Sequence, residues 1–203
     1  MILMASVVTW ETADGYSPLV SFFNTVSPIS KEAMDFLDKN TTLLSIEKKK
    51  FLLKPGAIIT DFYFIIKGVI HGFIKEGDKQ ITTWINEEGE IVSSMSNLGT
   101  NKPCEEYLQA LEDCVLIAIP IAITEEAFEV YPETNAVARR LWEHNYRGAE
   151  ERAYLGRIPS AEKKYKKFIE KNPNLMNRIP LKYIASYLGM TVETLCRIRA
   201  RQK

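Results

Sequence analysis

The chain has 203 residues, enough for one large domain or two small ones that each bury a core. Apolar residues make up 46% of it and charged residues 26%, and no apolar run approaches the ~20 residues of a transmembrane helix. The formal net charge is zero. These values argue against a membrane protein, and we expect no membrane partner.

The zero net charge hides a division along the chain. Residues 157–203 hold 12 Lys and Arg against 3 Asp and Glu, whereas the residues before them hold 14 basic and 23 acidic side chains. A basic segment on an otherwise acidic protein predicts a polyanionic partner for that segment alone. A solvated, lysine-rich helix without a partner would show the same charge, so both interpretations stay open at this point.

The start of the chain and the cysteines indicate a protein of the reducing cytoplasm. Residues 1–8 lack a basic leader and are too short for a signal peptide, so we do not expect export. Cys104, Cys114 and Cys196 are an odd, scattered set. Their spacing matches neither a disulfide framework nor a zinc or iron–sulfur site, and we expect no metal site.

Residues 17–40 are predicted to be helical, and the pattern then changes. Ser30 is placed to cap a helix with Met34 and Leu37 on its apolar side. From about residue 43 to residue 120, short apolar runs alternate with turn residues, which indicates an all-β sandwich or barrel. Glu76-Gly77-Asp78 is a predicted hairpin tip. The expected strands are Lys50–Lys54, Asp61–Ile66, Val69–Lys75, Gln80–Ile85 and Cys114–Ile119.

A long helix is predicted from Glu133 to about Leu155, where apolar and small residues recur at intervals of three to four. The stripe is formed by Val137, Leu141, Asn145, Gly148 and Ala149. It predicts either a seam against a second helix or a helix packed on its own β-domain. Residues 156–159 are expected to break this helix and to act as a hinge.

A shorter helix should follow the hinge. Ser160 is placed to cap it, Tyr165, Phe168 and Ile169 form its inner side, and residues 172–174 close it.

The segment Leu181–Arg199 carries the most specific pattern of the chain. Two short helices that cross steeply need a small residue at the crossing, which Ala185 supplies, and a left-handed turn, which Gly189 supplies four residues later. Thr191 is placed to cap the second helix. The residues predicted to close the small core are Ile184, Leu188, Met190, Leu195 and Ile198. Their joint spacing predicts a helix-turn-helix.

The second helix of this motif offers side chains for reading DNA. Val192, Glu193 and Arg197 share the face away from the core, where Glu193 can accept from a cytosine amino group and Arg197 can donate to guanine. A surface ion pair between Glu193 and Arg197 is the alternative. Lys182, Arg199 and Arg201 are expected to contact phosphates. The predicted DNA-binding residues are Lys182, Thr191, Val192, Glu193, Arg197, Arg199 and Arg201.

The combination of a β-rich domain, a long helix and a terminal helix-turn-helix resembles the Crp/Fnr family of transcription regulators. The markers of the resemblance are Pro55-Gly56, Phe64–Gly68, Ala110–Asp113, Tyr165, Ile184–Gly189 and Glu193–Arg197. The resemblance implies an α+β protein with an N-terminal double-stranded β-helix (jelly roll), a long dimerisation helix and a C-terminal winged helix-turn-helix-like domain. The expected domains are a cyclic-nucleotide-binding-like β-domain (17–132), the dimerisation helix (133–156) and the DNA-binding domain (157–203).

The expected sensor site departs from the family pattern. Members that bind cyclic AMP place an arginine on the cyclic phosphate, but no arginine precedes Arg139 here, and Glu105 and Glu106 stand about where it is expected. Negative charge there would repel a phosphate, and Lys102 lacks the bidentate fork of arginine, so cyclic AMP is a disfavoured effector. Val192 stands where many members have a further arginine, so the half-site is expected to differ. The candidate effector-pocket residues are Ser93, Ser94, Asn97, Lys102, Glu105 and Tyr107.

Other cofactors of the family have no support in the sequence. The N-terminal cysteine cluster of its oxygen-sensing members is missing, and His71 and His144 are the only histidines. We expect both to be partly exposed side chains rather than haem ligands.

The resulting hypothesis is a cytoplasmic, homodimeric regulator that binds an inverted repeat in double-stranded DNA. An unidentified small-molecule effector and RNA polymerase complete its expected partners. One alternative is an enzyme on the β-barrel, for which neither clustered metal ligands nor a nucleophile–base pair is evident, so we expect no enzyme. The other is an interaction module whose basic C-terminal domain binds an acidic partner, which the DNA-reading spacing argues against.

Overall fold

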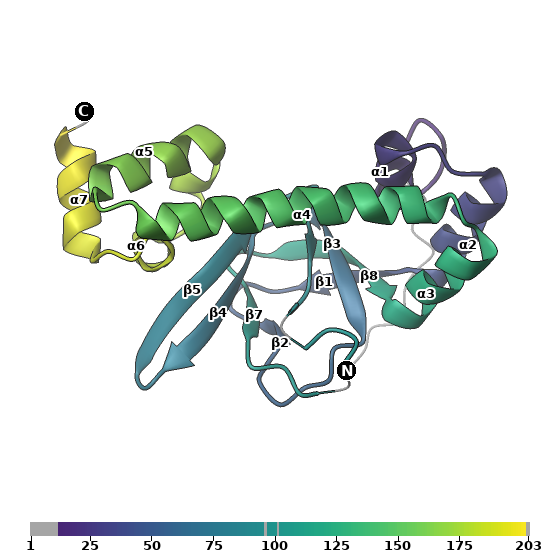
Figure 1. Cartoon of the computed structure of the whole chain (residues 1–203), viewed down its shortest axis with the longest axis horizontal. Coiled ribbons are helices and arrows are strands. Elements are labelled where there is room, and N and C mark those ends of the chain that lie inside the picture. Colours follow the sequence, from purple (N-terminus) through teal and green to yellow (C-terminus); the bar gives the residue numbers. More distant parts are fainter. Residues whose placement is uncertain (1–11, 96, 101, 202–203) are drawn as a thin grey trace.

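A computed structural model describes residues 12–95, 97–100 and 102–201, so the opening segment 1–8 lies outside the described residues. A β-domain lies beneath one long helix, α4 (Thr134–Arg157), which runs from a group of N-terminal helices at one end to the C-terminal helices at the other (Figure 1). This arrangement is the α+β architecture expected from the sequence. Within the described residues, no helix is both long and apolar enough to cross a membrane.

The helices before the β-domain form where the sequence predicts them. Helix α1 (Pro18–Val26) is capped by Ser17, and α2 (Lys31–Asn40) is capped by Ser30, whose Oγ accepts from the backbone N–H of Ala33 at 3.3 Å. Their apolar sides pack against α3 (Ile121–Val130) and the first turns of α4. The buried residues of this cluster are Val20, Ile29, Ala33, Leu37, Ala127 and Val137.

The β-domain consists of two antiparallel four-stranded sheets, in the orders β1-β8-β3-β6 and β2-β7-β4-β5. Such a pair of facing sheets is a jelly roll, as expected. The strands are β1 (Thr42–Ile46), β2 (Phe51–Leu53), β3 (Asp61–Lys67), β4 (Ile70–Glu76), β5 (Lys79–Asn86), β6 (Ile91–Val92), β7 (Tyr107–Ala110) and β8 (Cys114–Pro120).

The core of the jelly roll follows from alternation along these strands. Ile70 of β4 and Leu108 and Ala110 of β7 are buried between the sheets with Ile65, while His71 of β4 lies on the opposite face. The hairpin between β4 and β5 turns at residues 77 and 78, as predicted. Three strands (β1, β6 and β7) and helix α3 were not predicted individually, and two of these strands have four residues or fewer.

Helix α4 decides between two alternatives for its first turns and ends within the predicted segment. Val137 is buried and Leu141 half-buried against the N-terminal helices of the same chain, so this part of the predicted seam packs on its own domain. The break predicted for residues 156–159 is confirmed, because α4 ends at Arg157 and the next helix begins at Ala161. A glycine inside a helix costs only about 1 kcal/mol, whereas Pro159 stops the helix by lacking an N–H.

The C-terminal part is helical throughout its described residues. Helix α5 (Ala161–Lys171) is capped by Ser160 and ends at Asn172, as predicted. A single 3₁₀ turn, η1 (Leu175–Asn177), leads to α6 (Leu181–Tyr187) and α7 (Val192–Arg201). Residues 157–201 contain no strand, so the wing expected from the family resemblance is not found in this described segment.

Candidate DNA-recognition site

The turn between α6 and α7 has the geometry that the sequence predicts. Gly189 adopts a φ of 63°, a left-handed conformation that glycine reaches at little cost. On either side of it, the N–H of Leu188 donates to the carbonyl of Ile184 at 2.9 Å and that of Met190 to the carbonyl of Ala185 at 3.0 Å. Ala185 is buried at the crossing, where a larger side chain would separate the two helices. The helix-turn-helix is therefore confirmed.

Helix α7 is held by a core shared among three helices. Ile184, Leu188, Leu195 and Ile198 are buried, while Met190 is half-buried beside them. Thr191 caps α7, because its Oγ1 accepts from the backbone N–H of Thr194 at 3.1 Å. Tyr165 and Phe168 of α5 complete this core. A reading helix fixed in this way presents its outer face in one orientation.

The outer face of α7 carries unpaired side chains. Val192 is 38% exposed, and Glu193, Cys196 and Arg197 are exposed as well. A hydrogen bond from its own backbone amide, and a second from the hydroxyl of Thr191, lower the pKa of Glu193. Within the described residues Glu193 and Arg197 form no ion pair. The alternative of a surface ion pair is thus not realised, and both side chains are available to a partner.

The remaining predicted contacts surround this face. Arg199 is half-buried and Arg201 exposed, and the 100° step of a helix places them on opposite flanks of the face. Lys182 projects from α6, with its Nζ 4.8 Å from the ring centroid of Tyr183. The structure thus gathers Val192, Glu193 and Arg197 on one face and leaves the three other cations around it.

Helix α6 is docked on the edge of the β-domain, a contact that the sequence did not reveal. Strand β5 is the last of its sheet, so its outer backbone groups lack a neighbouring strand. The N–H of Thr82 donates to Oγ of Ser186 at 2.9 Å, and this hydroxyl donates to the carbonyl of Gln80 at 3.1 Å. One serine therefore satisfies part of an open sheet edge.

Arg178, which lies between η1 and α6, stabilises the contact between α6 and the β-domain. Arg178 donates to Glu87 at 3.2 Å, to Glu88 at 2.6 Å and to Glu112, all three from loops of the β-domain. The bond to Arg178 is the main cause that lowers the pKa of Glu88 to about 2. Burial raises the pKa of Glu87, although the same guanidinium opposes that shift.

Replacing Arg178 with methionine should destabilise the chain. It would leave three neighbouring carboxylates without their partner, at a cost of about 1–3 kcal/mol in the free energy of unfolding. Glu88 has a folded pKa of about 2 against an ordinary value of 4.5, so it stabilises the fold above pH 4.5 and loses that effect as the pH falls toward 2. Between pH 4.5 and pH 2, the melting temperature of Arg178→Met should therefore fall less than that of the parent chain. The control is Arg157→Met on an exposed arginine; equal melts for the two variants would contradict the prediction.

Trp84 of β5 packs against the core of the jelly roll and is partly buried. This residue pairs with Gly72 of β4, and a Cβ on Gly72 would lie 2.2 Å from the nearest indole carbon. The indole packs with the buried residues between the sheets, and its Nε1–H donates to Oε1 of Glu106 at 3.0 Å. The hydroxyl of Thr83 donates to the same oxygen at 2.6 Å. The carboxylate of Glu106 is therefore bound by two side chains of β5 in the same domain.

Comparisons with known proteins agree with this geometry. The model of the cyclic nucleotide-binding domain matches residues 43–131. The fumarate and nitrate reduction regulatory protein of Vibrio cholerae is 28% identical over 172 residues, which cover 77% of this chain and 66% of that protein. The anaerobic regulatory protein of Aggregatibacter actinomycetemcomitans is 27% identical, over 77% of this chain and 65% of its own. The chain thus spans about two thirds of the length of these relatives.

Solved structures show the same fold. FixK2 of Bradyrhizobium japonicum superposes with a TM-score of 0.68 at 18% identity, over 79% of this chain and 83% of its own. A regulator from Eubacterium rectale, described as a member of the Crp/Fnr family, also gives 0.68, at 14% identity over 90% and 88% of the two chains. The chain thus contains a match to the cyclic nucleotide-binding domain and has the fold of these solved regulators.

The residues expected to form an effector pocket have different surroundings. Ser93 and Ser94 are buried, with Oγ of Ser93 donating to the carbonyl of Asp61 at 3.0 Å. Asn97 donates to the carbonyl of Pro103 at 2.7 Å. Lys102 and Glu105 are exposed.

Tyr107 lies on the outer face of strand β7. Its ring stacks on Phe73 with centroids 4.6 Å apart, on the sheet face opposite the core. Alternation along β7 explains this position, because Leu108 and Ala110 face inward and Tyr107 therefore faces outward.

The histidines differ from the expectation in one case. His71 is fully buried rather than partly exposed, because its ring packs between Phe73 and Tyr183, with centroids 5.0 and 4.7 Å away. Burial lowers the pKa of His71 to about 4, so the ring is neutral. His144 is exposed, with Nε2 3.4 Å from Glu90. The described residues hold no group of three or more His, Cys, Asp or Glu suited to a metal ion.

Proposed function

We propose that this chain is a sequence-specific DNA-binding transcription regulator. The observation that carries the proposal is the exposed face of α7, where Glu193 and Arg197 form no ion pair among the described residues and lie above a packed helix-turn-helix core. An ionised glutamate and an arginine on such a face match the acceptor and the donor that read cytosine and guanine edges in the major groove. The names of the curated relatives, which are regulatory proteins, support the same role.

The proposal includes a homodimer through helix 133–156. Trp142 is 48% exposed and Tyr146 68%, and Ala149 and Ala153 continue the same line along α4 at heptad spacing. Large exposed aromatic residues next to small ones suit the close approach of a second helix. This line lies beside the predicted stripe, whose first residues pack on the chain's own N-terminal helices.

A charge on this line should separate the subunits. In a two-fold symmetric dimer, Tyr146→Glu places one buried carboxylate from each subunit in the interface. We expect the dimer dissociation constant to rise about 100-fold, which corresponds to roughly 3 kcal/mol. Sedimentation equilibrium measures it. Because Tyr146 is exposed in the single chain, the thermal stability of the monomeric variant should equal that of the parent monomer. The control Arg147→Glu reverses a charge on the opposite flank of the exposed helix surface, and a similar dissociation in this variant would contradict the interface.

Selection from a random duplex library tests the function directly. The two α7 helices of a dimer should enrich an inverted repeat with half-sites about 34 Å apart, and affinity should fall steeply with salt. The selection is made without additive, with cyclic AMP and with cell extract. An enriched inverted repeat in any condition supports the proposal, and no enriched sequence in all three would contradict it.

The remaining parts of the proposal follow from DNA as the target. The regulator acts in the cytoplasm, carries out no catalytic step and contacts RNA polymerase at some of its promoters. Its β-domain responds to an effector other than cyclic AMP, because no arginine that could hold a cyclic phosphate precedes Arg139 and Glu106 carries negative charge near the expected position.

A further inference from the structure

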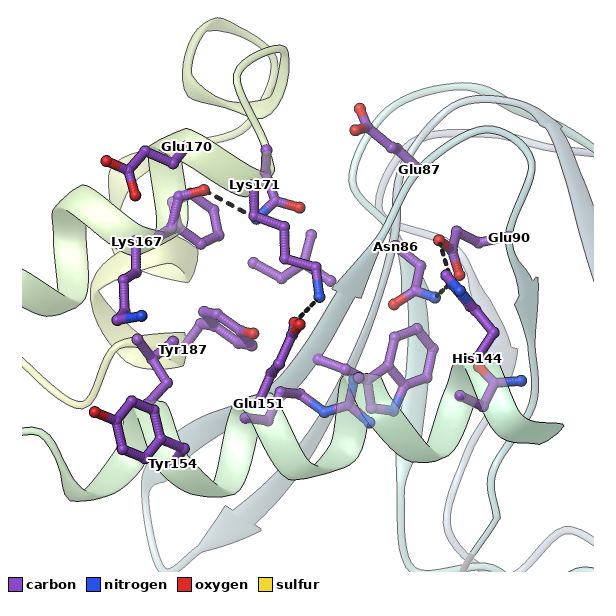
Figure 2. A pocket seen from close by; sticks show the side chains of 18 residues that line it. Asn86, Glu87, Glu90, His144, Glu151, Tyr154, Lys167, Glu170, Lys171 and Tyr187 are labelled. Carbon is purple, nitrogen blue, oxygen red and sulfur yellow. Dashed lines mark hydrogen bonds and ion pairs between the residues drawn. The ribbon is translucent and has the colours of Figure 1, made fainter. Parts of the chain in front are cut away.

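A cavity of about 580 Å³ lies where the β-domain, α4 and the C-terminal helices meet (Figure 2). Its walls come from the end of β5, from residues 144–155 of α4, from α5 and from Tyr187 of α6. The volume is within the range of sites that bind small molecules. None of the predicted effector-pocket residues lines it.

The acidic side chains of this cavity are already paired. Figure 2 shows Glu151 with Lys171 and Glu90 with His144, the latter pair at 3.4 Å. Glu87 is paired with Arg178 at 3.2 Å, and Glu170 lies 4.0 Å from Lys166. Each carboxylate of the lining thus has a cationic or titratable partner.

Two cations of the lining have no such partner. Among the described residues Arg152 and Lys167 form neither an ion pair nor a hydrogen bond. The Nζ of Lys167 lies 5.5 Å from the ring centroid of Tyr154, and Figure 2 shows these side chains next to each other. Arg152 and Lys167 are therefore the two lining cations that no carboxylate of the described residues pairs with.

Arg152 is half-buried in a position that Gly148 leaves open. A Cβ at Gly148 would lie 3.3 Å from Nη1 of Arg152, so the guanidinium folds back over the glycine one turn earlier in α4. Burial raises the pKa of Tyr187, and the charge of Arg152 opposes that shift, which places the guanidinium near this ring. The planar fork of arginine is suited to binding a carboxylate or phosphate at two points.

We propose that this cavity binds a small organic anion with a planar ring, whose carboxylate or phosphate is held by Arg152. Flat aromatic walls for the ring come from Trp84, Tyr154, Phe168 and Tyr187. Lys167 supplies a second positive charge at the Tyr154 side.

The position of the cavity gives such a ligand a regulatory effect, which rests on the proposed function. Its walls belong to the β-domain, α4 and the C-terminal helices, so a bound anion favours the arrangement in which all three lie together. A ligand of this kind would stabilise the docked position of α6 on β5.

Calorimetric titration of the full chain without DNA tests the site. The probes are 2-naphthoate, 2-naphthyl phosphate and the neutral 2-naphthamide. We expect one site per chain for at least one anion, binding at least about tenfold more weakly in Arg152→Gln, whereas the neutral amide binds weakly to both proteins. The two anions separate a carboxylate ligand from a phosphate ligand.

The matched control is Arg157→Gln, which removes an exposed arginine from the same helix and should leave the affinities unchanged. Equal binding of the anions and the amide, equal affinities of Arg152→Gln and the parent chain, or no binding of either anion at millimolar concentration would overturn the proposal. Because the titration contains no DNA, its failure is distinct from a failure of the DNA-binding function.

Discussion

Arg197→Ala is expected to abolish sequence-specific DNA binding while leaving the fold intact. Arg197 is exposed and touches no core residue, so its removal should not change the thermal stability. One base-reading arginine contributes about 1–3 kcal/mol, and a dimer loses it in both half-sites, so the dissociation constant should rise at least ~30-fold. Fluorescence anisotropy with the selected operator measures this loss. The preference at one base pair of each half-site should relax at the same time.

A phosphate-contacting residue should behave differently on the same motif. Lys182→Ala is expected to weaken binding to all sequences about equally and to reduce the slope of the salt dependence by about two, one for each subunit of the dimer. Lys39→Ala, which removes an exposed charge from α2, controls for net charge and should change neither quantity. If Arg197→Ala weakened operator and non-specific DNA equally, the assignment of Arg197 to base reading would be wrong.

Gly72→Ala is expected to lower the free energy of unfolding of the β-domain strongly. The added Cβ would lie 2.2 Å from the Trp84 ring, whose position is fixed by Glu106 and by the packing between the sheets. Overpacking of this kind costs about 3 kcal/mol. Chemical denaturation measures the free energy of unfolding. The same substitution at Gly156, where nothing lies within 4 Å, should instead stabilise α4 by up to about 1 kcal/mol.

The cause of the Gly72→Ala loss can be isolated with a second substitution. Trp84→Leu removes the ring that the new Cβ would meet, so the double variant should be more stable than the sum of the two single effects predicts. A positive coupling of at least about 1 kcal/mol is expected for residues in direct contact. Additive effects would mean that the indole moves aside and that Gly72 is not required for close approach.

The features that were predicted correctly depend on residues close together in the chain. The helix-turn-helix is specified by Ala185, Gly189 and Thr191 within a few residues, and the caps Ser30 and Ser160 each act on the next turn. The long strands were found because alternation over several residues is a local signal. The two-residue strand β6 carries too few residues for such a signal.

The features that were missed depend on residues far apart. Thr82 and Ser186 are 104 positions apart, and no local pattern marks either as the partner of the other. The same holds for Arg178 and its three carboxylates. The sequence left the partner of the α4 stripe open because periodicity defines a stripe but not the surface that covers it. For the same reason the cavity at the junction of the three parts could not be predicted.

The apolar core of the helix-turn-helix includes Val69 and Leu111 of the β-domain beside Leu175, Ile184 and Leu195. Because these residues form one cluster, the two parts should lose their structure together in a single cooperative transition. A C-terminal fragment made alone would expose an apolar surface and lack part of its own interior. Substitutions that destabilise the β-domain should therefore also weaken DNA binding. This holds even though no residue of the β-domain contacts a base in the proposed complex.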